Sequence, residues 1–315
     1  MKKPLFLVLL LVIMFGALSV IPALAQDDNT TQEQPYFPAW DGESRFTILI
    51  MGMDRRPGAR DTLRVRTDVM ILLSIDPQTQ SIGMLHIPRD IHLVPPNSPN
   101  FIRANTLMVE GEELQTGIGP YYAMDTMQYN FGMYVDRFIA FDFEAFIAII
   151  DALGGVEITT TYTINDPEYP DMNYGLDPFF LSRGTHLLDG RTALQYARTR
   201  HGDNDFVRGL RQLEVIEAVY ERVTGDGMLP YLVGLAPTLL DQLDRNIYTD
   251  LQLPDMIQLA QFASNVPFDN IASDTINVSH NMTYTLPSGN SVFIPDRENI
   301  DELLVEVFGE NYYVR

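Results

Sequence analysis

Along this chain, short apolar runs rich in β-branched and aromatic residues alternate with amphipathic segments of helical period. The runs predict strands at residues 46–51, 67–75, 81–87, 137–141 and 156–160, with two shorter ones at 271–278 and 291–294. The amphipathic segments predict helices at residues 121–134, 142–153, 189–198, 206–223, 229–243, 254–264 and 296–308. Interleaved strands and helices indicate the α/β class, in a single layered α-β-α domain with a central mixed sheet.

Turn and cap residues support these boundaries. Residues 76–79 (Asp-Pro-Gln-Thr) form a turn signal that joins the second and third strands into a hairpin. Asp142 is expected to cap the helix that follows it, and Gly154-Gly155 to end that helix. Residues 161–184 hold many Asp, Pro, Tyr and Asn residues and little periodicity, which predicts a long loop over a site.

The first 25 residues have the features of an export signal. Lys2 and Lys3 precede an almost unbroken apolar stretch, and Ala23-Leu24-Ala25 has the pattern of a cleavage site. The apolar run at residues 4–25 is also long enough to span a bilayer, so a cleaved signal peptide and a membrane anchor both remain open. Either interpretation places the remainder outside the cytoplasm, as a linker at residues 26–44 and a globular domain at residues 45–315.

Composition excludes several classes of function. The chain has no cysteine, which excludes disulfides, thiolate metal sites and a cysteine nucleophile. A formal net charge of -21 disfavours a nucleic-acid partner. The five histidines show no H-E-x-x-H spacing for zinc, and no G-x-S-x-G elbow indicates a serine hydrolase. Lys2 and Lys3 are the only lysines, so the other basic residues are arginines, whose planar guanidinium fits phosphate oxygens.

Charged residues gather at the expected ends of the first three strands. Asp54 follows the first strand, Arg66 and Asp68 stand at the start of the second, and Arg89 and Asp90 follow the third. In a hairpin the start of one strand neighbours the end of its partner, so Asp68 and Arg89 should lie close together. Asp54 should lie near them if the first strand pairs alongside. Ends of strands are where α/β proteins place their ligands.

A second group of polar residues surrounds the start of the helix predicted at residues 206–223. Arg198 and Arg200 precede this helix, and Asp205 is placed to cap it. Arg208 and Gln212 are four residues apart and share one helical face. A helix N-terminus rimmed by arginines is a natural phosphate site.

Two separated carboxylates, Asp54 and Asp68, among several arginines suggest a phosphate clamp with a hard metal ion. Mg²⁺ (or Mn²⁺) is held by one or two carboxylates plus phosphate oxygens, and arginines neutralise charge on a transferring or leaving phosphate. Each residue taken singly also has an ordinary interpretation. Asp205 can be a plain helix cap, Asp54 and Asp90 turn residues, and the arginines partners of the 42 acidic residues.

The order of these motifs resembles that of the LytR-CpsA-Psr (LCP) family. The matching segments are ILIMGMDRR, RTDVMILLSIDPQTQSIGMLHIPRD, RFIAFDFEAFIAIIDALGGVEI, GTHLLDGRTALQYARTRH and DFVRGLRQ. The resemblance implies an α/β sandwich that accommodates a polyprenyl tail, and an extracytoplasmic phosphotransferase. Such an enzyme would attach teichoic acid, capsule or similar glycopolymers from an undecaprenyl pyrophosphate carrier to peptidoglycan at the outer face of the membrane. With water as acceptor it would act as a pyrophosphatase.

The resemblance also implies roles for individual residues. Asp54 and Asp68 would hold Mg²⁺ with the pyrophosphate, and Asp205 would be a polar site residue. By position, either Asp90 or Asp205 is a candidate base for the acceptor hydroxyl. The pyrophosphate would be contacted by Arg66, Arg89, Arg103, Arg198, Arg200, Arg208 and Gln212. The expected catalytic set is Asp68, Arg89, Arg198, Arg200 and Asp205. Apolar segments at residues 121–150 and 210–240 would line the lipid groove or, alternatively, pack as ordinary core.

Some positions depart from the family pattern. Val207 stands where the family often has Gly, and His86 where it often has Ser. The cleavage pattern at residues 23–25 is unexpected for a family that is usually membrane-anchored. Two alternatives stay open: a non-catalytic module that binds lipid-linked or wall polymers, and a regulator.

Overall fold

The computed structural model describes residues 38–314 except 56–62, 172–174, 200–204, 225–244 and 264. The predicted helix at residues 229–243 and the predicted export signal therefore lie outside the described residues. Among the described helices, none combines the length and apolarity needed to cross a membrane.

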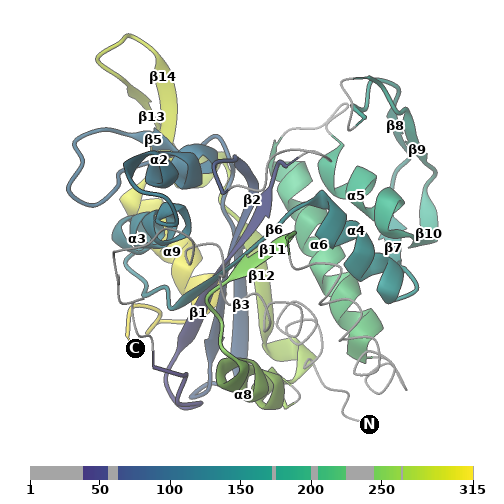
Figure 1. Cartoon of the computed structure of the whole chain (residues 1–315), viewed down its shortest axis with the longest axis horizontal. Helices are drawn as coiled ribbons and strands as arrows, with labels where there is room; N and C mark the ends of the chain where they lie inside the picture. Colours follow the sequence, from purple (N-terminus) through teal and green to yellow (C-terminus); the bar gives the residue numbers. More distant parts are fainter. Residues whose placement is uncertain are drawn as a thin grey trace, which may run out of the picture.

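A six-stranded mixed sheet forms the centre of the molecule, in the order β11-β6-β1-β2-β3-β12 (Figure 1). The hairpins β1–β2 and β2–β3 are antiparallel, β6 runs parallel to β1, β12 runs parallel to β3, and β11 runs antiparallel to β6. The strands are β1 (Phe46–Met53), β2 (Thr67–Asp76), β3 (Ser81–His86), β6 (Arg137–Phe141), β11 (Ile247–Thr249) and β12 (Ile271–Thr275). This arrangement confirms the predicted central mixed sheet.

The sheet is buried on both faces because its apolar residues alternate between two cores. In β1, Ile48 packs into one hydrophobic cluster and the next residue, Leu49, into the other. The same alternation places Ile71 and Leu72 of β2 in different clusters. A sheet covered on both sides by apolar side chains requires helices on both sides, and the molecule has three layers.

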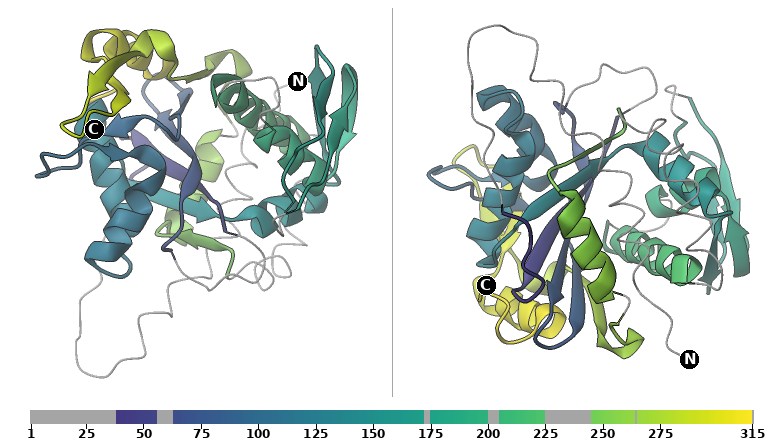
Figure 2. Two further views of the ribbon diagram at one scale, coloured as in Figure 1. Left: turned by 90° about the horizontal axis from the view of Figure 1, so that it is seen from above. Right: turned by 60° about the horizontal axis from the view of Figure 1, so that its bottom comes forward.

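The two faces of the sheet are covered by different sets of helices (Figures 1 and 2). The first comprises α2 (Leu107–Leu114), α3 (Gly119–Phe131) and α9 (Arg297–Phe308). The second comprises α4 (Phe143–Ala152), α5 (Gly190–Arg198) and α6 (Asp205–Thr224). At one end of the sheet, α8 (Leu253–Ala263) joins the second core. The predicted cap at Asp142 is confirmed, since its side chain accepts a hydrogen bond from the Ala145 amide at 3.0 Å.

Short two-stranded ladders decorate both sides of the molecule. They pair β4 (His92–Leu93) with β5 (Ile102–Arg103), β7 (Val156–Thr160) with β10 (Gly184–Leu188), β8 (Ile164–Asp166) with β9 (Phe179–Leu181), and β13 (Asn281–Thr285) with β14 (Ser291–Pro295). Single-turn 3-10 helices occupy Ala104–Thr106, Phe268–Asn270 and Val278–His280.

Two predicted boundaries are corrected by the structure. Residues 161–184 are not one continuous loop, because Ile164 and Leu181 meet in the β8–β9 ladder and bury their side chains. The predicted linker at residues 26–44 extends too far, because Trp40 is only 5% exposed and packs on Phe46 and Phe262. The folded body therefore begins before residue 45.

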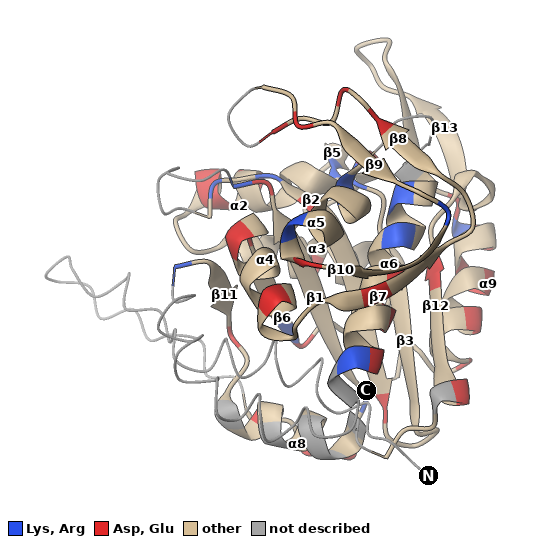
Figure 3. Cartoon of the chain, turned by 90° about the vertical axis from the view of Figure 1, so that its right-hand side faces the viewer, with Lys and Arg blue, Asp and Glu red and all other residues tan. Residues whose placement is uncertain are grey.

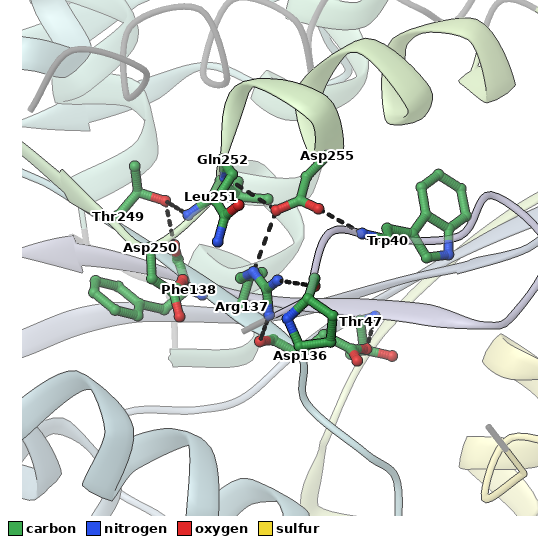
Figure 4. A network of polar contacts seen from close by, with 11 residues as sticks. Trp40, Thr47, Asp136, Arg137, Phe138, Thr249, Asp250, Leu251, Gln252 and Asp255 are labelled. Atoms are coloured by element: carbon green, nitrogen blue, oxygen red, sulfur yellow. Dashed lines mark hydrogen bonds and ion pairs between the residues drawn. The ribbon is translucent and has the colours of Figure 1, made fainter. Parts of the chain in front are cut away.

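A buried polar network fixes this N-terminal segment to the start of β6 (Figure 4). Arg137 Nε lies 3.3 Å from Asp255 Oδ2, and both side chains are almost fully buried. Arg137 also donates to the Pro38 carbonyl at 2.7 Å, while Asp255 Oδ1 accepts from the Trp40 amide at 2.6 Å. One ion pair thus joins the N-terminal segment, β6 and α8.

Candidate functional site

The ends of three strands bring the predicted acidic and basic residues together. β1 ends, β2 begins and β3 ends at the same edge of the sheet, as the pairs Gly52–Val69 and Ile71–His86 show. Directly beyond that edge, the Asp54 amide donates to the Arg66 carbonyl at 2.8 Å. The first strand therefore pairs alongside the second, which is the condition under which the sequence placed Asp54 near Asp68 and Arg89.

Asp68 is the centre of this edge. Its Oδ2 accepts a hydrogen bond from Arg89 at 2.8 Å, and its Oδ1 accepts one from Asn105 at 2.9 Å. Burial alone would raise the pKa of Asp68, but the hydrogen bonds from Asn105 and Arg89 and the charge of Arg208 outweigh it and lower that pKa. Asp68 is therefore an ionised carboxylate at neutral pH. The predicted proximity of Asp68 and Arg89 is confirmed.

Further ion pairs extend the charged edge outward. Arg66 lies 3.3 Å from Asp54, with the arginine largely exposed. Asp90 lies 3.4 Å from Arg89 Nε and 3.5 Å from Arg103. These partly exposed pairs leave the side chains accessible to a ligand, and exposed pairs of this kind contribute little to stability.

The first described turns of α6 lie against the end of β3. A side chain at Gly209 would collide with His86, since a Cβ there would stand 2.4 Å from His86 Nδ1. His86 is fully buried and its Nδ1 lies 2.8 Å from Thr275 Oγ1. The close approach of helix and strand brings Arg208, which is 2% exposed, within electrostatic range of Asp68. Gln212 is also buried and donates to the Ala197 carbonyl at 3.3 Å.

Arg198 ends α5 between two aromatic rings. Its guanidinium carbon lies 4.1 Å from the Phe143 ring centroid and 5.8 Å from that of Tyr169, whose hydroxyl accepts a hydrogen bond at 3.2 Å. Stacking on aromatic faces is characteristic of arginine and fixes the plane of the fork. Arg200 and the side chain of Asp205 lie outside the described residues.

Arg211 is a buried residue that the sequence interpretation missed. It is 1% exposed, donates to the Tyr196 carbonyl at 3.1 Å and to the Tyr162 hydroxyl at 3.1 Å, and also bonds the Thr199 carbonyl. These bonds fix the backbone on both sides of Arg198 against α6. The available signal was its position three residues after Arg208, on an adjoining part of the same helical face.

The donor atoms at the edge fit a hard cation. Asp54 and Asp68 provide carboxylate oxygens, and an oxygen that accepts one hydrogen bond from Arg66, Arg89 or Asn105 keeps a second lone pair. The buried Asn105 Oδ1 next to Asp68 has no hydrogen-bond partner among the described residues. Across that same described part of the chain, no three acidic or histidine side chains gather into a metal cage. Mg²⁺ needs only one or two carboxylates when phosphate oxygens complete its shell.

Figure 3 shows how the arginine-bearing segments face one another across this end of the molecule. Basic residues of β5, α5 and the start of α6 gather there, coming from one peripheral ladder and from the helical layer of α4, α5 and α6. The chain as a whole is strongly acidic, with a formal net charge of -21. A local concentration of arginine on such a background attracts anions selectively.

The lipid-groove segments fall on different sides of the sheet. Met124 and Met127 of α3 pack in the core with α9, whereas Ile149 of α4 and Leu213 of α6 belong to the other core. Among the described residues, α3 therefore lies on the opposite side of the sheet from α6. α4 and the described part of α6 share a core.

Comparisons with known proteins agree with this fold. The chain is 24% identical over 262 residues to the polyisoprenyl-teichoic acid–peptidoglycan teichoic acid transferase TagV of Bacillus subtilis, covering 82% of this chain and 62% of the relative. It is 30% identical over 216 residues to the transferase TagU of Halalkalibacterium halodurans, covering 68% and 64%. The chain thus spans about three fifths of the length of these curated relatives.

Solved structures show the same architecture. The structure entitled "TagT bound to LIIa-WTA" matches with a TM-score of 0.64 and 23% identity, covering 92% of this chain and 98% of that one. The crystal structure of B. subtilis TagV matches with a TM-score of 0.64 and 22% identity, covering 86% and 98%. The sequence model of the LytR_cpsA_psr family matches residues 18–308, which is most of the sequence. The chain is therefore a member of the LytR_cpsA_psr family.

Proposed function

We propose that this chain is an extracytoplasmic phosphotransferase that moves a glycopolymer from a polyprenyl pyrophosphate carrier to a hydroxyl of peptidoglycan. The observation that carries the proposal is the arrangement around Asp68. An ionised carboxylate there holds Arg89 at 2.8 Å and lies within the field of the buried Arg208. Several guanidinium groups held in place at this edge of the sheet form a binding site for a pyrophosphate dianion.

The relatives support the substrate class. TagV, TagU and TagT are named as transferases of teichoic acid from a polyisoprenyl carrier to peptidoglycan. One neighbouring structure is entitled "TagT bound to LIIa-WTA". The charged edge of this chain has the residue chemistry that such an anionic head group requires.

In the proposed reaction, a peptidoglycan hydroxyl attacks the phosphorus atom that carries the glycopolymer. The bond from that phosphorus to the bridging oxygen breaks, a phosphodiester forms, and polyprenyl phosphate leaves. Arg89 and Arg208 stabilise charge on the leaving phosphate, and Arg198 and Arg200 are the further expected contacts. The hydroxyl proton passes to a carboxylate, for which Asp90 and Asp205 are the candidates by position.

Mg²⁺ is the proposed cofactor, held by Asp54 and Asp68. When bound, it would neutralise pyrophosphate charge and orient the oxygens for in-line attack. Arg66, at 3.3 Å from Asp54, orients that carboxylate, and Asn105 orients Asp68. Arg103 and Gln212 complete the expected contacts with substrate.

The experiment uses the full-length chain with a polyprenyl pyrophosphate, with and without Mg²⁺, and measures phosphate release. We expect Mg²⁺-dependent release that falls at least about 100-fold in Arg89→Ala, the loss typical of removing one charge-stabilising donor. Arg297→Ala is the matched control, because Arg297 is an exposed arginine at the first residue of α9. Tight binding of the pyrophosphate without any turnover would instead identify a binding module. Wild-type release by Arg89→Ala would refute the assigned role.

A further inference from the structure

An uncharged hairpin projects from the site end of the molecule with aromatic and apolar side chains on its surface. The hairpin comprises residues 281–295, that is β13, β14 and the turn between them (Figure 1). Met282 is 48% exposed, Tyr284 40% and Phe293 52%. Exposed apolar side chains on a soluble protein are normally scattered singly over the surface. Several of them on one small element therefore mark a contact surface.

The hairpin is joined to the charged edge by backbone pairing. Phe293 of β14 forms a parallel bridge with Ile91. Ile91 directly follows Asp90, which contacts both Arg89 and Arg103. The adjoining β4 also pairs with β5, so His92 lies opposite Arg103. The strands β13, β14, β4 and β5 therefore lie side by side in this order, and the last of them carries Arg103, one of the proposed pyrophosphate contacts.

The exposed rings have defined places on the hairpin. Tyr284 stands opposite Val292, and Met282 opposite Ile294, so these four side chains share one face. Phe101, from the loop before β5, supports that face, with its ring centroid 4.9 Å from that of Tyr284. Phe293 stands opposite Thr283 on the other face. A ring held from one side and open on the other is a pre-organised stacking surface.

The polar side chains of the hairpin are hydroxyls and amides only. Residues 281–295 contain Asn, Thr and Ser but no charged residue, in a chain that carries 42 acidic residues. Aromatic rings with neutral hydrogen-bonding groups match a ligand that has apolar C–H faces and hydroxyls, which is the chemistry of a saccharide ring. A neutral ligand also avoids the repulsion that the acidic surface imposes on anions.

A lipid surface fits the hairpin less well. No lysine or arginine occurs between Arg245 and Arg297, so electrostatic attraction to an anionic headgroup is missing from this segment. The exposed tip, residues 287–290, reads Pro-Ser-Gly-Asn and carries no large apolar side chain for insertion. The apolar side chains lie along the strands and beside Phe101.

We propose that the hairpin of residues 281–295, together with Phe101, is the platform that binds the glycan backbone of the acceptor, next to the pyrophosphate site. This rests on the proposed transferase function for its place in the reaction. A saccharide ring would stack on Tyr284 on one face and bond to the neighbouring hydroxyl and amide groups, while Phe293 offers a second ring on the opposite face. The path through Ile91 then presents an acceptor hydroxyl toward Arg89 and Asp90.

The test measures binding of chitohexaose, a neutral N-acetylglucosamine oligomer, to the full-length chain by calorimetry with no pyrophosphate donor present. We expect Tyr284→Ala to weaken the affinity about tenfold, the loss that corresponds to about 1.4 kcal/mol. Tyr284→Phe keeps the ring and should bind within about twofold of the wild type, on the scale where 1.4 kcal/mol is tenfold. Phe293→Ala tests the second face independently.

The matched control is Tyr313→Ala. Tyr313 is 62% exposed and packs on another ring, that of Tyr312, at 5.5 Å between centroids, but lies outside the hairpin. We expect no change in chitohexaose affinity. Thermal unfolding of each variant shows whether the fold is retained, and Phe293→Ala keeps the test valid if Tyr284→Ala unfolds.

Three results would overturn the platform. They are no chitohexaose binding by the wild type at millimolar concentration, equal binding by Tyr284→Ala, and Tyr284-dependent association with phosphatidylcholine–phosphatidylglycerol vesicles in place of chitohexaose. The outcome is independent of the transferase assay because no donor is present. A chain that binds chitohexaose through Tyr284 yet releases no phosphate would refute the transfer reaction and leave the platform standing.

Discussion

The Asp68 carboxylate accepts hydrogen bonds from two side chains and is also stabilised by the positive charge of a third. Arg89 and Asn105 each occupy one oxygen, and Arg208 acts through its charge. The sequence predicted the Asp68–Arg89 pair from hairpin geometry alone. It did not predict that Asn105, in a separate 3-10 turn, would complete the set, because that contact depends on how the chain returns after β5.

Replacing Asp68 by Asn should separate charge from shape. The amide keeps the volume and one acceptor but removes the negative charge that Asp68 presents to Arg89, so we expect phosphate release to fall at least about 100-fold. Because the pKa of Asp68 is lowered from 3.8 in the folded state, its stabilising contribution is present at neutral pH and is lost as the pH falls below about 4. Urea unfolding at pH 7 and pH 3 should therefore show a smaller acid loss in Asp68→Asn than in the wild type.

Asp250 should behave in the opposite sense. Burial raises its pKa from 3.8 to about 7, and its Oδ1 accepts from the Phe138 amide at 2.9 Å. Between those two values the folded state holds a proton that the unfolded state has lost, so this group's contribution to stability falls as the pH rises. We expect Asp250→Asn to be more stable than the wild type at pH 8 by about 1–2 kcal/mol, and to show a flatter dependence between pH 5 and pH 8. Equal slopes in urea unfolding would contradict this assignment.

At the scale of elements, local signals sufficed where a segment makes its own pattern. The amphipathic period of α4 and α6 and the apolar runs of β1, β2 and β3 are all visible in the sequence, and each was predicted within a few residues. The segments that were missed owe their structure to distant partners. β8 and β9 are three residues each and exist because Ile164 pairs with Leu181.

The helix α2 shows how tertiary packing overrides a weak local preference. Gly111 lowers the helical propensity of its middle, so the sequence did not indicate a helix there. In the structure this glycine allows a close contact, since a Cβ at Gly111 would lie 2.7 Å from the Gly119 Cα of α3. Gly111 thus weakens the helical pattern in the sequence and at the same time allows α2 and α3 to pack closely.

A comparable close contact at Gly209 packs α6 against His86 of β3. Gly209→Ala would place a Cβ 2.4 Å from the buried His86 ring, so α6 must move away from β3. We expect a loss of about 1–3 kcal/mol in the free energy of unfolding, as for other overpacked sites. Phosphate release should also fall, because the neighbouring Arg208 moves with the helix.

The adjacent residue supplies the control for that prediction. Leu210 lies on the same helix and is 45% exposed, so Leu210→Ala should change the free energy of unfolding by no more than about 0.5 kcal/mol. Chemical denaturation of both variants distinguishes a specific contact from a general effect of substitution in α6. A Gly209→Ala variant as stable as the wild type would show that helix and strand separate at no cost.

For the whole molecule, the buried Arg137–Asp255 pair holds three parts of the chain together. Removing one partner leaves an uncompensated buried charge, so Arg137→Met and Asp255→Leu should each cost about 3–5 kcal/mol. The double variant should cost less than the sum, with a coupling of at least about 1 kcal/mol. Arg191→Ala breaks the exposed pair with Asp177 and should cost at most about 1 kcal/mol. Additive losses in the double-mutant cycle would show that the network is not cooperative.

This network also determines at which end of the central sheet the N-terminal segment lies. Pro38 and Trp40 are fastened at the start of β6, whereas Asp54 and Arg66 lie beyond the opposite end of β1. An eight-residue strand separates the two by roughly 25 Å at about 3.3 Å per residue. A sensor chip, a bead or a bilayer attached to the chain before Pro38 would therefore hold the molecule at the end of β1 opposite Asp54 and Arg66, and would leave the end that carries these residues and the hairpin 281–295 facing away from the attachment point.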